Sequence, residues 1–395
     1  MTISGFGGVK GTSHGSGRLD CVNGHLLESG MTIPNRSPRS IAVAALLALP
    51  LMSCSRDPVQ TGGEIVAGVD LDALFAPATA GEIASVQAEW GTRAAGAVGV
   101  DVMEDTVVAQ SGLDLRVRLV SHVVDDLRHV GAVISGSAAA GPRPVIVYAH
   151  GGDEGVSVED VLFLCSLLGA DAARFIWVVP SFRSEPLRFL GKTWSSQGGP
   201  SPWDRDVDDA LALLDAAVSI EPAVDEANVA VLGFSRGAGV ALLMGVRDPR
   251  ITRIVDFFGP TDFLGPFVRT VARESLLGDP RDLPGLTYLD ETFLQPLARG
   301  ETSMAKVRLE LVRRSAVLWA ERLPMVQLHH GDADPIVEVS QAESLIAAMT
   351  ANGRAEPDFQ AYLYPGGAHT PLTLPGSIDR AVVFLRALLP APLVH

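Results

Sequence analysis

The segment 228–243, N-V-A-V-L-G-F-S-R-G-A-G-V-A-L-L, constrains the fold of this chain most strongly. Its unbroken apolar run at 229–232 predicts a strand buried on both faces. Small and apolar residues that suit a helix packed close to a sheet follow the run. Between strand and helix stands G-x-S-x-G, centred on Ser235, the pattern of the nucleophile elbow. Because this pattern is short and common, the rest of the chain decides what it means.

From residue 144 onward, predicted strands and helices alternate. Buried apolar runs predict strands at 144–149, 175–179, 229–232, 251–258, 325–329 and 359–364. Helical spacing of apolar residues predicts helices at 158–170, 204–218, 237–246, 338–349 and 377–389. An alternating pattern at 106–110 and 113–122 predicts a hairpin before them. This order implies an α/β fold whose mostly parallel sheet carries helices on both faces and binds ligands beyond the carboxyl ends of its strands.

The segment 261–323 interrupts this alternation. It separates two predicted strands by far more than the usual loop length. Its second part, 304–319, has helical spacing. We expect this insertion to lie over the active-site face as a cap. The alternative is a surface elaboration that contacts no substrate.

A serine nucleophile needs a base, and the base needs an acid that orients it. After an elbow serine, the acid precedes the histidine in the chain. His369 follows the last predicted strand and is the expected base. The segment H-G-D-A-D-P-I-V at 330–337 follows the preceding strand, and in it Asp334 is the expected acid. Asp332 is expected to bond local backbone N–H groups instead, and Asp262 is a third candidate.

Acyl transfer also needs donors for the charge that develops on the carbonyl oxygen. The backbone N–H of Arg236, directly after the serine, is the first expected donor. The second is expected from Gly152 or Asp153, in the loop H-G-G-D that follows the strand 144–149. Taken alone, this loop is a tight strand-to-helix turn. A serine, an aspartate and a histidine in the required order on strand ends favour the donor role.

Four blocks of sequence together resemble the α/β-hydrolase fold, and within it the prolyl oligopeptidase-like and dienelactone hydrolase-like branch. They are H-G-G-D at 150–153, G-F-S-R-G at 233–237, H-G-D-A-D-P-I-V at 330–337 and G-G-A-H at 366–369. The resemblance implies an eight-stranded, mostly parallel sheet with an antiparallel first hairpin. Prolyl oligopeptidase relatives usually carry an N-terminal β-propeller, and no propeller periodicity is visible here. Their oxyanion loop often ends in proline, where this chain has Asp153 and Glu154. Both departures weaken a peptidase assignment.

These residues predict a serine hydrolase that cleaves carboxylic esters through an acyl-enzyme. Ser235 would attack the carbonyl, His369 would move the proton and Asp334 would orient His369. A serine peptidase or amidase of the prolyl oligopeptidase-like family is the first alternative, and it would use the same residues. A non-catalytic lipoprotein that binds a ligand on a hydrolase scaffold is the second alternative.

Three aromatic side chains, Phe189, Trp194 and Trp203, lie in the loop that precedes the helix at 204–218. Together with the insertion they are expected to shape the substrate pocket, although they could equally be internal to the fold. The substrate is expected to be a small ester or a short peptide.

No cofactor and no metal is predicted. The sequence shows no phosphate loop and no dinucleotide fingerprint. His329 and His330 with Asp332 are a conceivable metal cluster, but their position at a strand end indicates packing. The net charge of −15 argues against a nucleic-acid partner, which would require a basic stripe.

Residues 1–54 predict processing signals rather than fold. From Met31, a polar segment with two arginines precedes an apolar run at 41–52, as in a secretory signal peptide, and the run is too short to span a membrane. Residues 51–54 resemble the bacterial lipobox, in which Cys54 would become the lipidated first residue. The alternative is a plain signal peptide with a chance cysteine. Residues 1–30 are expected to precede the true start at Met31.

The rest of the chain is divided into a linker at 55–70 and a catalytic domain at 71–395. We expect export to the bacterial cell envelope, with a membrane contact through the lipid anchor if Cys54 is modified. Without that anchor the protein would be periplasmic or secreted.

Overall fold

The computed structural model describes residues 63–93, 96–136 and 141–390. The predicted signal peptide, the lipidation candidate Cys54 and most of the predicted linker lie outside these ranges. Within them, no helix has both the length and the apolar character needed to cross a membrane.

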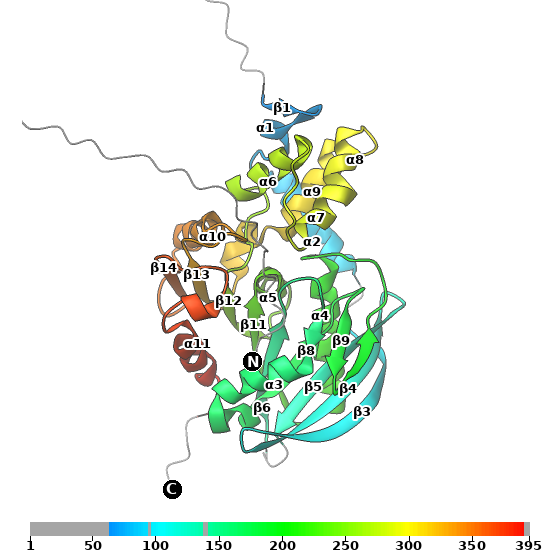
Figure 1. Cartoon of the computed structure of the whole chain (residues 1–395), viewed down its shortest axis with the longest axis vertical. Helices are drawn as coiled ribbons and strands as arrows, with labels where there is room; N and C mark the ends of the chain where they lie inside the picture. The colour runs from blue at the N-terminus through cyan, green and yellow to red at the C-terminus, as the bar shows by residue number, and fades with distance from the viewer. Residues whose placement is uncertain (1–62, 94–95, 137–140, 391–395) are drawn as a thin grey trace, which may run out of the picture. The chain divides into compact units, whose positions relative to one another are not determined.

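A large sheet runs through the described part of the chain (Figure 1). Its strands are β3 (Val98–Gln110), β4 (Leu113–Val124), β5 (Leu127–Gly136), β6 (Arg143–Ala149), β8 (Ile176–Pro180), β11 (Val224–Phe234), β12 (Ile251–Phe257), β13 (Met325–Gly331) and β14 (Phe359–Tyr364). They are arranged in the order β14-β13-β12-β11-β6-β8-β5-β4-β3. The pairs from β14 to β8 are parallel, and those from β8 to β3 are antiparallel. The α/β class and the mostly parallel sheet are confirmed, but the sheet has nine strands rather than eight.

The strand that was not predicted from the sequence is β5. Asp125 and Asp126 join it to β4, and their φ angles of 52° and 61° are those of a type I′ turn. The sequences typical of such turns are Asn-Gly and Asp-Gly, so the pair Asp-Asp does not predict a hairpin. Gly131 also interrupts the apolar run of β5. The strand is nevertheless buried between β4 and β8.

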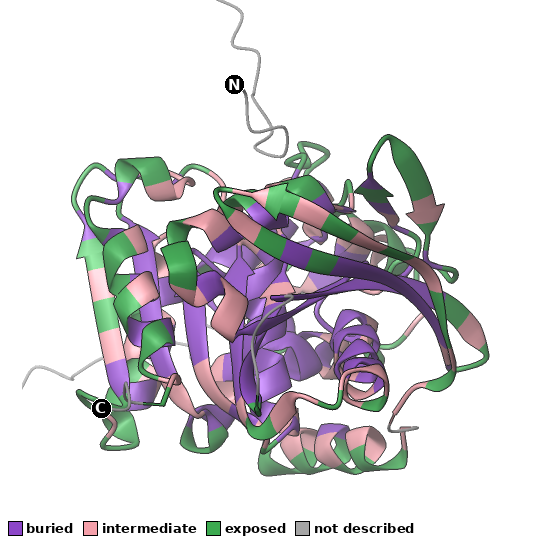
Figure 2. Cartoon of the chain, turned by 90° about the horizontal axis from the view of Figure 1, so that it is seen from below, coloured by how far each residue is buried: buried purple, intermediate pink, exposed green. Residues whose placement is uncertain are grey.

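Helices pack on both faces of the sheet, each over its own apolar core. On one face, α4 (Arg205–Ile220), α5 (Arg236–Arg247) and α10 (Ser340–Ala351) share a hydrophobic cluster with the strands. On the other face, α3 (Val158–Leu167) and α11 (Ser377–Arg386) belong to a second cluster. Figure 2 shows the central strands buried over their length and the edge of the sheet largely exposed. The central strands are therefore packed on both faces, and this packing fixes the positions of their carboxyl ends.

The insertion between β12 and β13 is helical. It contains α6 (Pro266–Leu276), α7 (Leu286–Leu289), a π-helical turn at Asp290–Leu294, α8 (Gln295–Ala298), α9 (Met304–Arg314) and a 3-10 segment at Ala316–Arg322. An N-terminal segment packs against α9; it comprises β1 (Ile65–Val66), β2 (Val69–Asp70), α1 (Leu71–Leu74) and α2 (Ala80–Thr92). The predicted linker extends to residue 70, but residues 65–70 form the β1–β2 hairpin.

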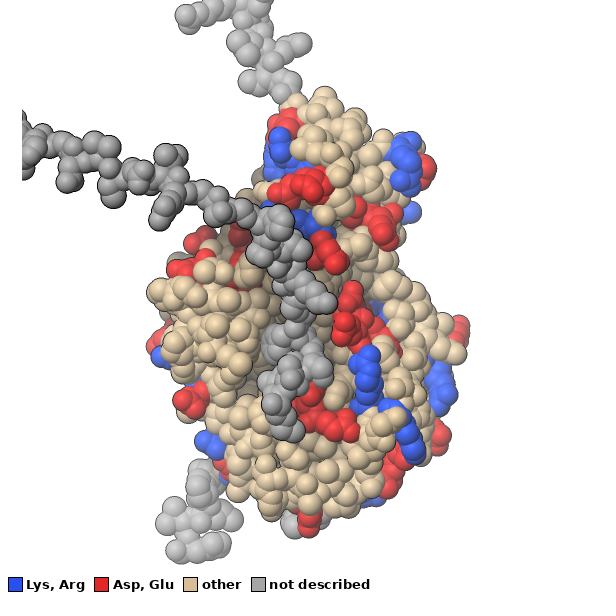
Figure 3. All heavy atoms as spheres, viewed as in Figure 1, with Lys and Arg blue, Asp and Glu red and all other residues tan. Residues whose placement is uncertain are grey.

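Arg308 of α9 holds the N-terminal segment in place. Its buried guanidinium donates hydrogen bonds of 2.6–3.2 Å. The acceptors are the carbonyl oxygens of Ala73, Leu74, Ala76 and Pro77 and both carboxylate oxygens of Glu82. The bond from Arg308 lowers the pKa of Glu82 to about 2. Figure 3 shows acidic and basic side chains next to each other on one face of the molecule. Arg269 of α6 also links the insertion to the N-terminal segment, through ion pairs with Glu64 and Asp72.

We expect Arg308→Met to lower the unfolding free energy by about 3 kcal/mol, because the buried carbonyl groups lose their donor. The N-terminal segment should then become sensitive to protease. Urea unfolding and mass spectrometry of limited digests would measure both effects. The matched control is Arg299→Met, which removes a half-exposed pair with Glu301 and should leave stability unchanged. Equal stability of the two variants would contradict the role of Arg308.

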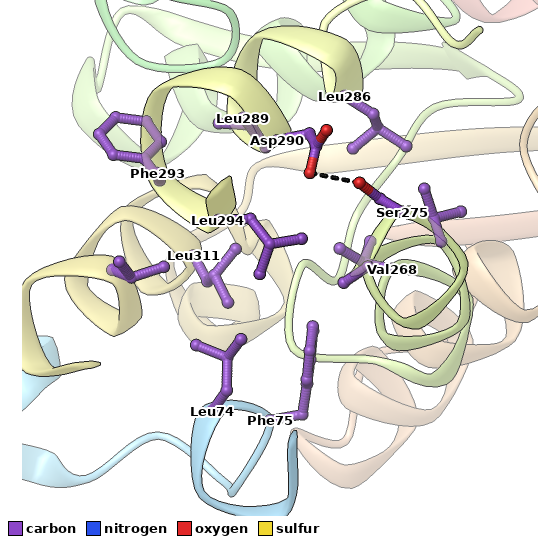
Figure 4. A pocket seen from close by; sticks show the side chains of 13 residues that line it. Leu74, Phe75, Val268, Ser275, Leu286, Leu289, Asp290, Phe293, Leu294 and Leu311 are labelled. Atoms are coloured by element: carbon purple, nitrogen blue, oxygen red, sulfur yellow. Dashed lines mark hydrogen bonds between the residues drawn. The ribbon is translucent and has the colours of Figure 1, made fainter. Parts of the chain in front are cut away.

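A small apolar cavity of about 50 Å³ lies between the insertion and the N-terminal segment (Figure 4). The side chains around it include Leu74, Phe75, Val268, Leu294 and Leu311. At its edge the Ser275 hydroxyl donates to the Asp290 carboxylate over 2.6 Å. The expected nucleophile, base and acid do not line it.

Candidate active site

Ser235 lies at the turn between β11 and α5, with φ 53° and ψ −122°. A positive φ is strained for any residue with a side chain and occurs at sites where the surrounding structure enforces it. Two glycines make the turn possible. A Cβ on Gly233 would lie 2.5 Å from the Ala238 Cα, and a Cβ on Gly237 would lie 2.0 Å from the Ala149 carbonyl oxygen. The local geometry is therefore that of a strand–elbow–helix turn.

His369 and Asp334 are in direct contact. The His369 Nδ1 and the Asp334 Oδ2 are 2.7 Å apart. The other carboxylate oxygen of Asp334 accepts the backbone N–H groups of Ile336 and Val337 at 2.9 and 3.0 Å. The imidazole also packs on the Phe258 ring, with centroids 4.3 Å apart. A carboxylate fixed by two backbone bonds can orient the imidazole and stabilise its cationic form.

The other two candidate acids have different partners. Asp332 accepts the Gly366 N–H at 2.6 Å and so joins the 330–337 segment to the loop that carries His369. Asp262 accepts the Leu264 N–H at 3.0 Å, at the start of the insertion. Among the described residues, Asp334 is the candidate acid that contacts His369.

Ser235 follows β11 and His369 follows β14, and within the described chain no hydrogen bond joins their side chains. The Ser235 N–H donates to the Phe257 carbonyl at 2.9 Å, and the next residue, Phe258, packs on His369. Catalytic hydrogen bonds in free enzymes are often long and tighten only when substrate binds.

The loop 150–153 lies against the elbow. Strands β6 and β11 are adjacent and parallel, with Ala149 paired with Gly233, so their carboxyl ends emerge side by side. A Cβ on Gly151 would lie 3.0 Å from the Phe234 carbonyl oxygen and 3.2 Å from the Ser235 Cβ. The Arg236 N–H is the first of α5, where backbone N–H groups lack helical acceptors. The structure thus brings the expected donor segments next to Ser235.

The Arg236 side chain is also part of this site, which was not predicted from the sequence. Its guanidinium is buried and forms a bidentate pair with Asp206 at 2.8 and 2.9 Å. It also donates to Glu185 at 2.5 Å and to the Gly152 carbonyl at 3.1 Å. The one available signal was an arginine in an otherwise small and apolar stretch, since a buried arginine requires acidic partners. No spacing in the sequence shows which carboxylates these are.

The aromatic residues expected in the pocket have other surroundings. Phe189 and Trp203 are each 2% exposed and lie in the hydrophobic cores. The Trp203 indole N–H donates to the Arg236 carbonyl at 3.0 Å, and its ring packs on Phe263. Trp194, on β10 (Lys192–Ser195), is half-buried. Phe189 and Trp203 therefore offer a ligand almost no surface and are internal to the fold.

His329 and His330 are buried and bonded within the fold. The His329 ring lies between the Tyr364 hydroxyl and the Gln327 side chain, at 2.8 and 3.0 Å, and burial lowers its pKa to about 3. The His330 Nε2 donates to the Val337 carbonyl at 2.8 Å. No set of three or more His, Cys, Asp or Glu side chains in the described ranges is arranged to hold a metal ion.

No protein-family model matches the sequence, and no curated protein matches it. Solved structures do resemble it. Acetyl xylan esterase 1 from Thermoanaerobacterium sp. JW/SL YS485 is 18% identical with a TM-score of 0.53, covering 83% of this chain and 96% of that chain. An acetyl xylan esterase from Paenibacillus sp. R4 is 17% identical with a TM-score of 0.51, covering 80% and 99% respectively. At these identities the likeness establishes the architecture, which is the α/β-hydrolase fold.

Proposed function

We propose that this chain, which has the α/β-hydrolase fold, is a serine hydrolase that cleaves carboxylic esters through an acyl-enzyme. The main support is the 2.7 Å contact between His369 and Asp334, on loops beside the strained Ser235 elbow. Ser235, Asp334 and His369 follow β11, β13 and β14, which are ordered in the sheet as they are in the chain. A protein that only binds a ligand has no need of all three groups.

In the proposed reaction, the Ser235 hydroxyl attacks the ester carbonyl while the His369 Nε2 accepts its proton. The carbonyl oxygen becomes an oxyanion and is bound by backbone N–H groups of Arg236 and the 150–153 loop. The tetrahedral intermediate collapses, and His369 returns the proton to the leaving alcohol. Water then attacks the acyl-enzyme by the same route and releases the acid. Asp334 keeps the Nδ1 proton on the far side of the ring throughout.

We propose that the substrate is an ester rather than an amide. The two similar structures described above, with TM-scores of 0.53 and 0.51, are both named acetyl xylan esterases, which supports a small acyl group. The charged Asp153 in the oxyanion loop, where prolyl oligopeptidase relatives often have proline, also disfavours the peptidase alternative.

Export through the signal at 31–54 and lipidation at Cys54 are further proposals from the sequence. Mass spectrometry of the mature N-terminus would test them.

The direct test combines substrate choice with labelling of the nucleophile. We expect turnover of p-nitrophenyl esters, little turnover of aminoacyl anilides, and fluorophosphonate labelling at Ser235. The Ser235→Ala variant should lose at least about 10⁴-fold in kcat, as other hydrolases do when the nucleophile is removed. Ser85→Ala, on the exposed side of α2, is the matched control and should keep full activity. Anilide turnover without ester turnover, or labelling at another residue, would overturn the proposal.

A further inference from the structure

We propose that the Arg236 side chain, supported by Glu185, orients the Gly152–Asp153 peptide so that the Asp153 N–H becomes the second oxyanion donor. This inference rests on the proposed acyl transfer at Ser235. It makes Arg236 a residue with two tasks. Its backbone N–H binds the oxyanion directly, and its side chain sets the position of the other donor.

The geometry of a peptide unit carries the first step. The Gly152 carbonyl oxygen accepts a hydrogen bond from the Arg236 Nη1 at 3.1 Å. In a planar trans peptide, the carbonyl oxygen and the following N–H point in opposite directions. With the Gly152 carbonyl directed at the guanidinium, the Asp153 N–H is directed away from it. Gly152 has φ 71°, a conformation that glycine adopts readily, so its own backbone does not prevent the peptide from turning over.

The position of the guanidinium is itself fixed. Arg236 is 3% exposed, and Asp206 at the start of α4 holds it through two hydrogen bonds. The Glu185 carboxylate accepts a hydrogen bond from the same Nη1 that donates to the Gly152 carbonyl. The guanidinium also lies 5.1 Å from the centre of the Phe182 ring. A buried arginine with this many partners has one available orientation. The peptide bound to it is therefore held more firmly than a loop exposed to water.

Glu185 connects the same guanidinium to the start of the loop. Its second carboxylate oxygen is 3.3 Å from the His150 Nε2, although the two groups are not aligned for a hydrogen bond. The His150 ring stacks on Phe182, with centroids 4.4 Å apart, and its Nδ1 is 3.1 Å from the Gly151 carbonyl oxygen. Just after the loop, β7 (Val156–Ser157) pairs with β9 (Pro186–Phe189), which directly follows Glu185. Both ends of the loop are thus attached to the segment that carries Glu185.

A buried ionic cluster of this kind adds little net stability compared with apolar packing. Its contribution here is the position of one peptide next to the nucleophile. The loss of one oxyanion donor typically lowers kcat by about 10²–10³-fold. Substrate binding before the reaction does not require the donor, so KM should change little.

The test is Arg236→Lys, which keeps the charge and the backbone N–H but cannot bind Asp206, Glu185 and Gly152 together. We expect kcat for p-nitrophenyl acetate to fall by about 100-fold with KM within about threefold. A short-chain alkyl trifluoromethyl ketone, which forms a tetrahedral oxyanion adduct with a catalytic serine, should lose affinity by a similar factor. A merely structural role would not produce this parallel loss. Glu185→Gln keeps the shape of the cluster and should show a smaller loss with the same pattern.

Arg118→Lys is the matched control. Arg118 is also buried, and it pairs with Glu221. It lies near the amino end of β11, whereas Ser235 follows the carboxyl end of that strand. This variant should lose stability and keep its kcat. If Arg236→Lys does not fold, Glu185→Gln decides the matter alone. Normal kcat, or unchanged ketone affinity, in the variant that folds would overturn this inference. Absence of both turnover and Ser235 labelling in the unmodified protein would instead overturn the proposed function and this inference with it.

Discussion

Replacing Asp334 by asparagine is expected to lower kcat by about 10⁴-fold while the protein stays folded. The carboxylate lies 2.7 Å from the His369 Nδ1, and its other oxygen accepts two backbone N–H groups. An asparagine can keep those backbone bonds with its carbonyl oxygen and then presents its NH₂ group to the imidazole. The Nδ1 must then act as acceptor, which places the ring proton on the Nε2. In that tautomer, His369 cannot accept the proton of Ser235.

Asp332→Asn is the control for this substitution. Asp332 is in the same segment and accepts a single backbone N–H, from Gly366 at 2.6 Å. An asparagine carbonyl can accept that bond, so kcat should change by no more than a few fold. Steady-state kinetics on p-nitrophenyl acetate would measure both variants, with circular dichroism to confirm folding. A large loss in Asp332→Asn and near-normal turnover in Asp334→Asn would reverse the assignment of the acid.

The parts of the site that could be predicted are those in which chemistry dictates local sequence. The elbow requires glycines at 233 and 237 because a Cβ at either position would collide with backbone. Serine, acid and histidine follow β11, β13 and β14, and the strands from β11 to β14 have the same order in the chain and in the sheet. The mostly parallel sheet followed from unbroken apolar runs alternating with amphipathic helices. Each motif or apolar run spans only a few residues, so a single sequence is enough to display it.

The features that escaped prediction depend on partners far apart in the chain. Arg236 meets Glu185 and Asp206 from positions 51 and 30 residues away, and the sequence contains many other acidic residues. Arg308 binds an N-terminal segment more than 200 residues distant. The burial of Trp203 depends on the insertion that packs on it. Long-range side-chain pairing of this kind leaves no periodic pattern, so only the folded chain reveals it.

A pair of buried histidines predicts how the fold responds to acid. His122 and His129 face each other across β4 and β5, with ring centroids 5.8 Å apart. None of their four ring nitrogens has a hydrogen-bond partner among the residues that the structure describes. Burial lowers the pKa of His122 to about 4. Burial, together with the Arg183 and His122 charges, lowers the pKa of His129 to about 3. Asp209 is 3.7 Å from His129, but both of its oxygens are bound by Arg183, so it does not hold a proton on the imidazole.

The sign of the pH dependence follows from these directions. An unfolded histidine has a pKa near 6.5, so below that pH the unfolded chain binds protons that the folded chain excludes. The stabilisation is complete above pH 6.5 and is lost as the pH falls toward the folded values. Each histidine should remove about 3 kcal/mol of stability between pH 7 and pH 4. The pair should therefore remove about 6 kcal/mol, comparable with the whole stability of many domains.

Replacing both histidines by leucine is expected to abolish this loss. Urea unfolding at several pH values between 4 and 8 would give the free-energy difference between variant and unmodified protein. That difference should grow as the pH falls, because all other titrating groups are common to both proteins. The variant with both histidines replaced by asparagine is the matched control, because its side chains are polar but cannot titrate. Its free energy of unfolding should depend on pH as that of the leucine variant does, although its value at pH 8 should differ. Parallel loss of stability in all three proteins would mean that the acid sensitivity comes from groups other than His122 and His129.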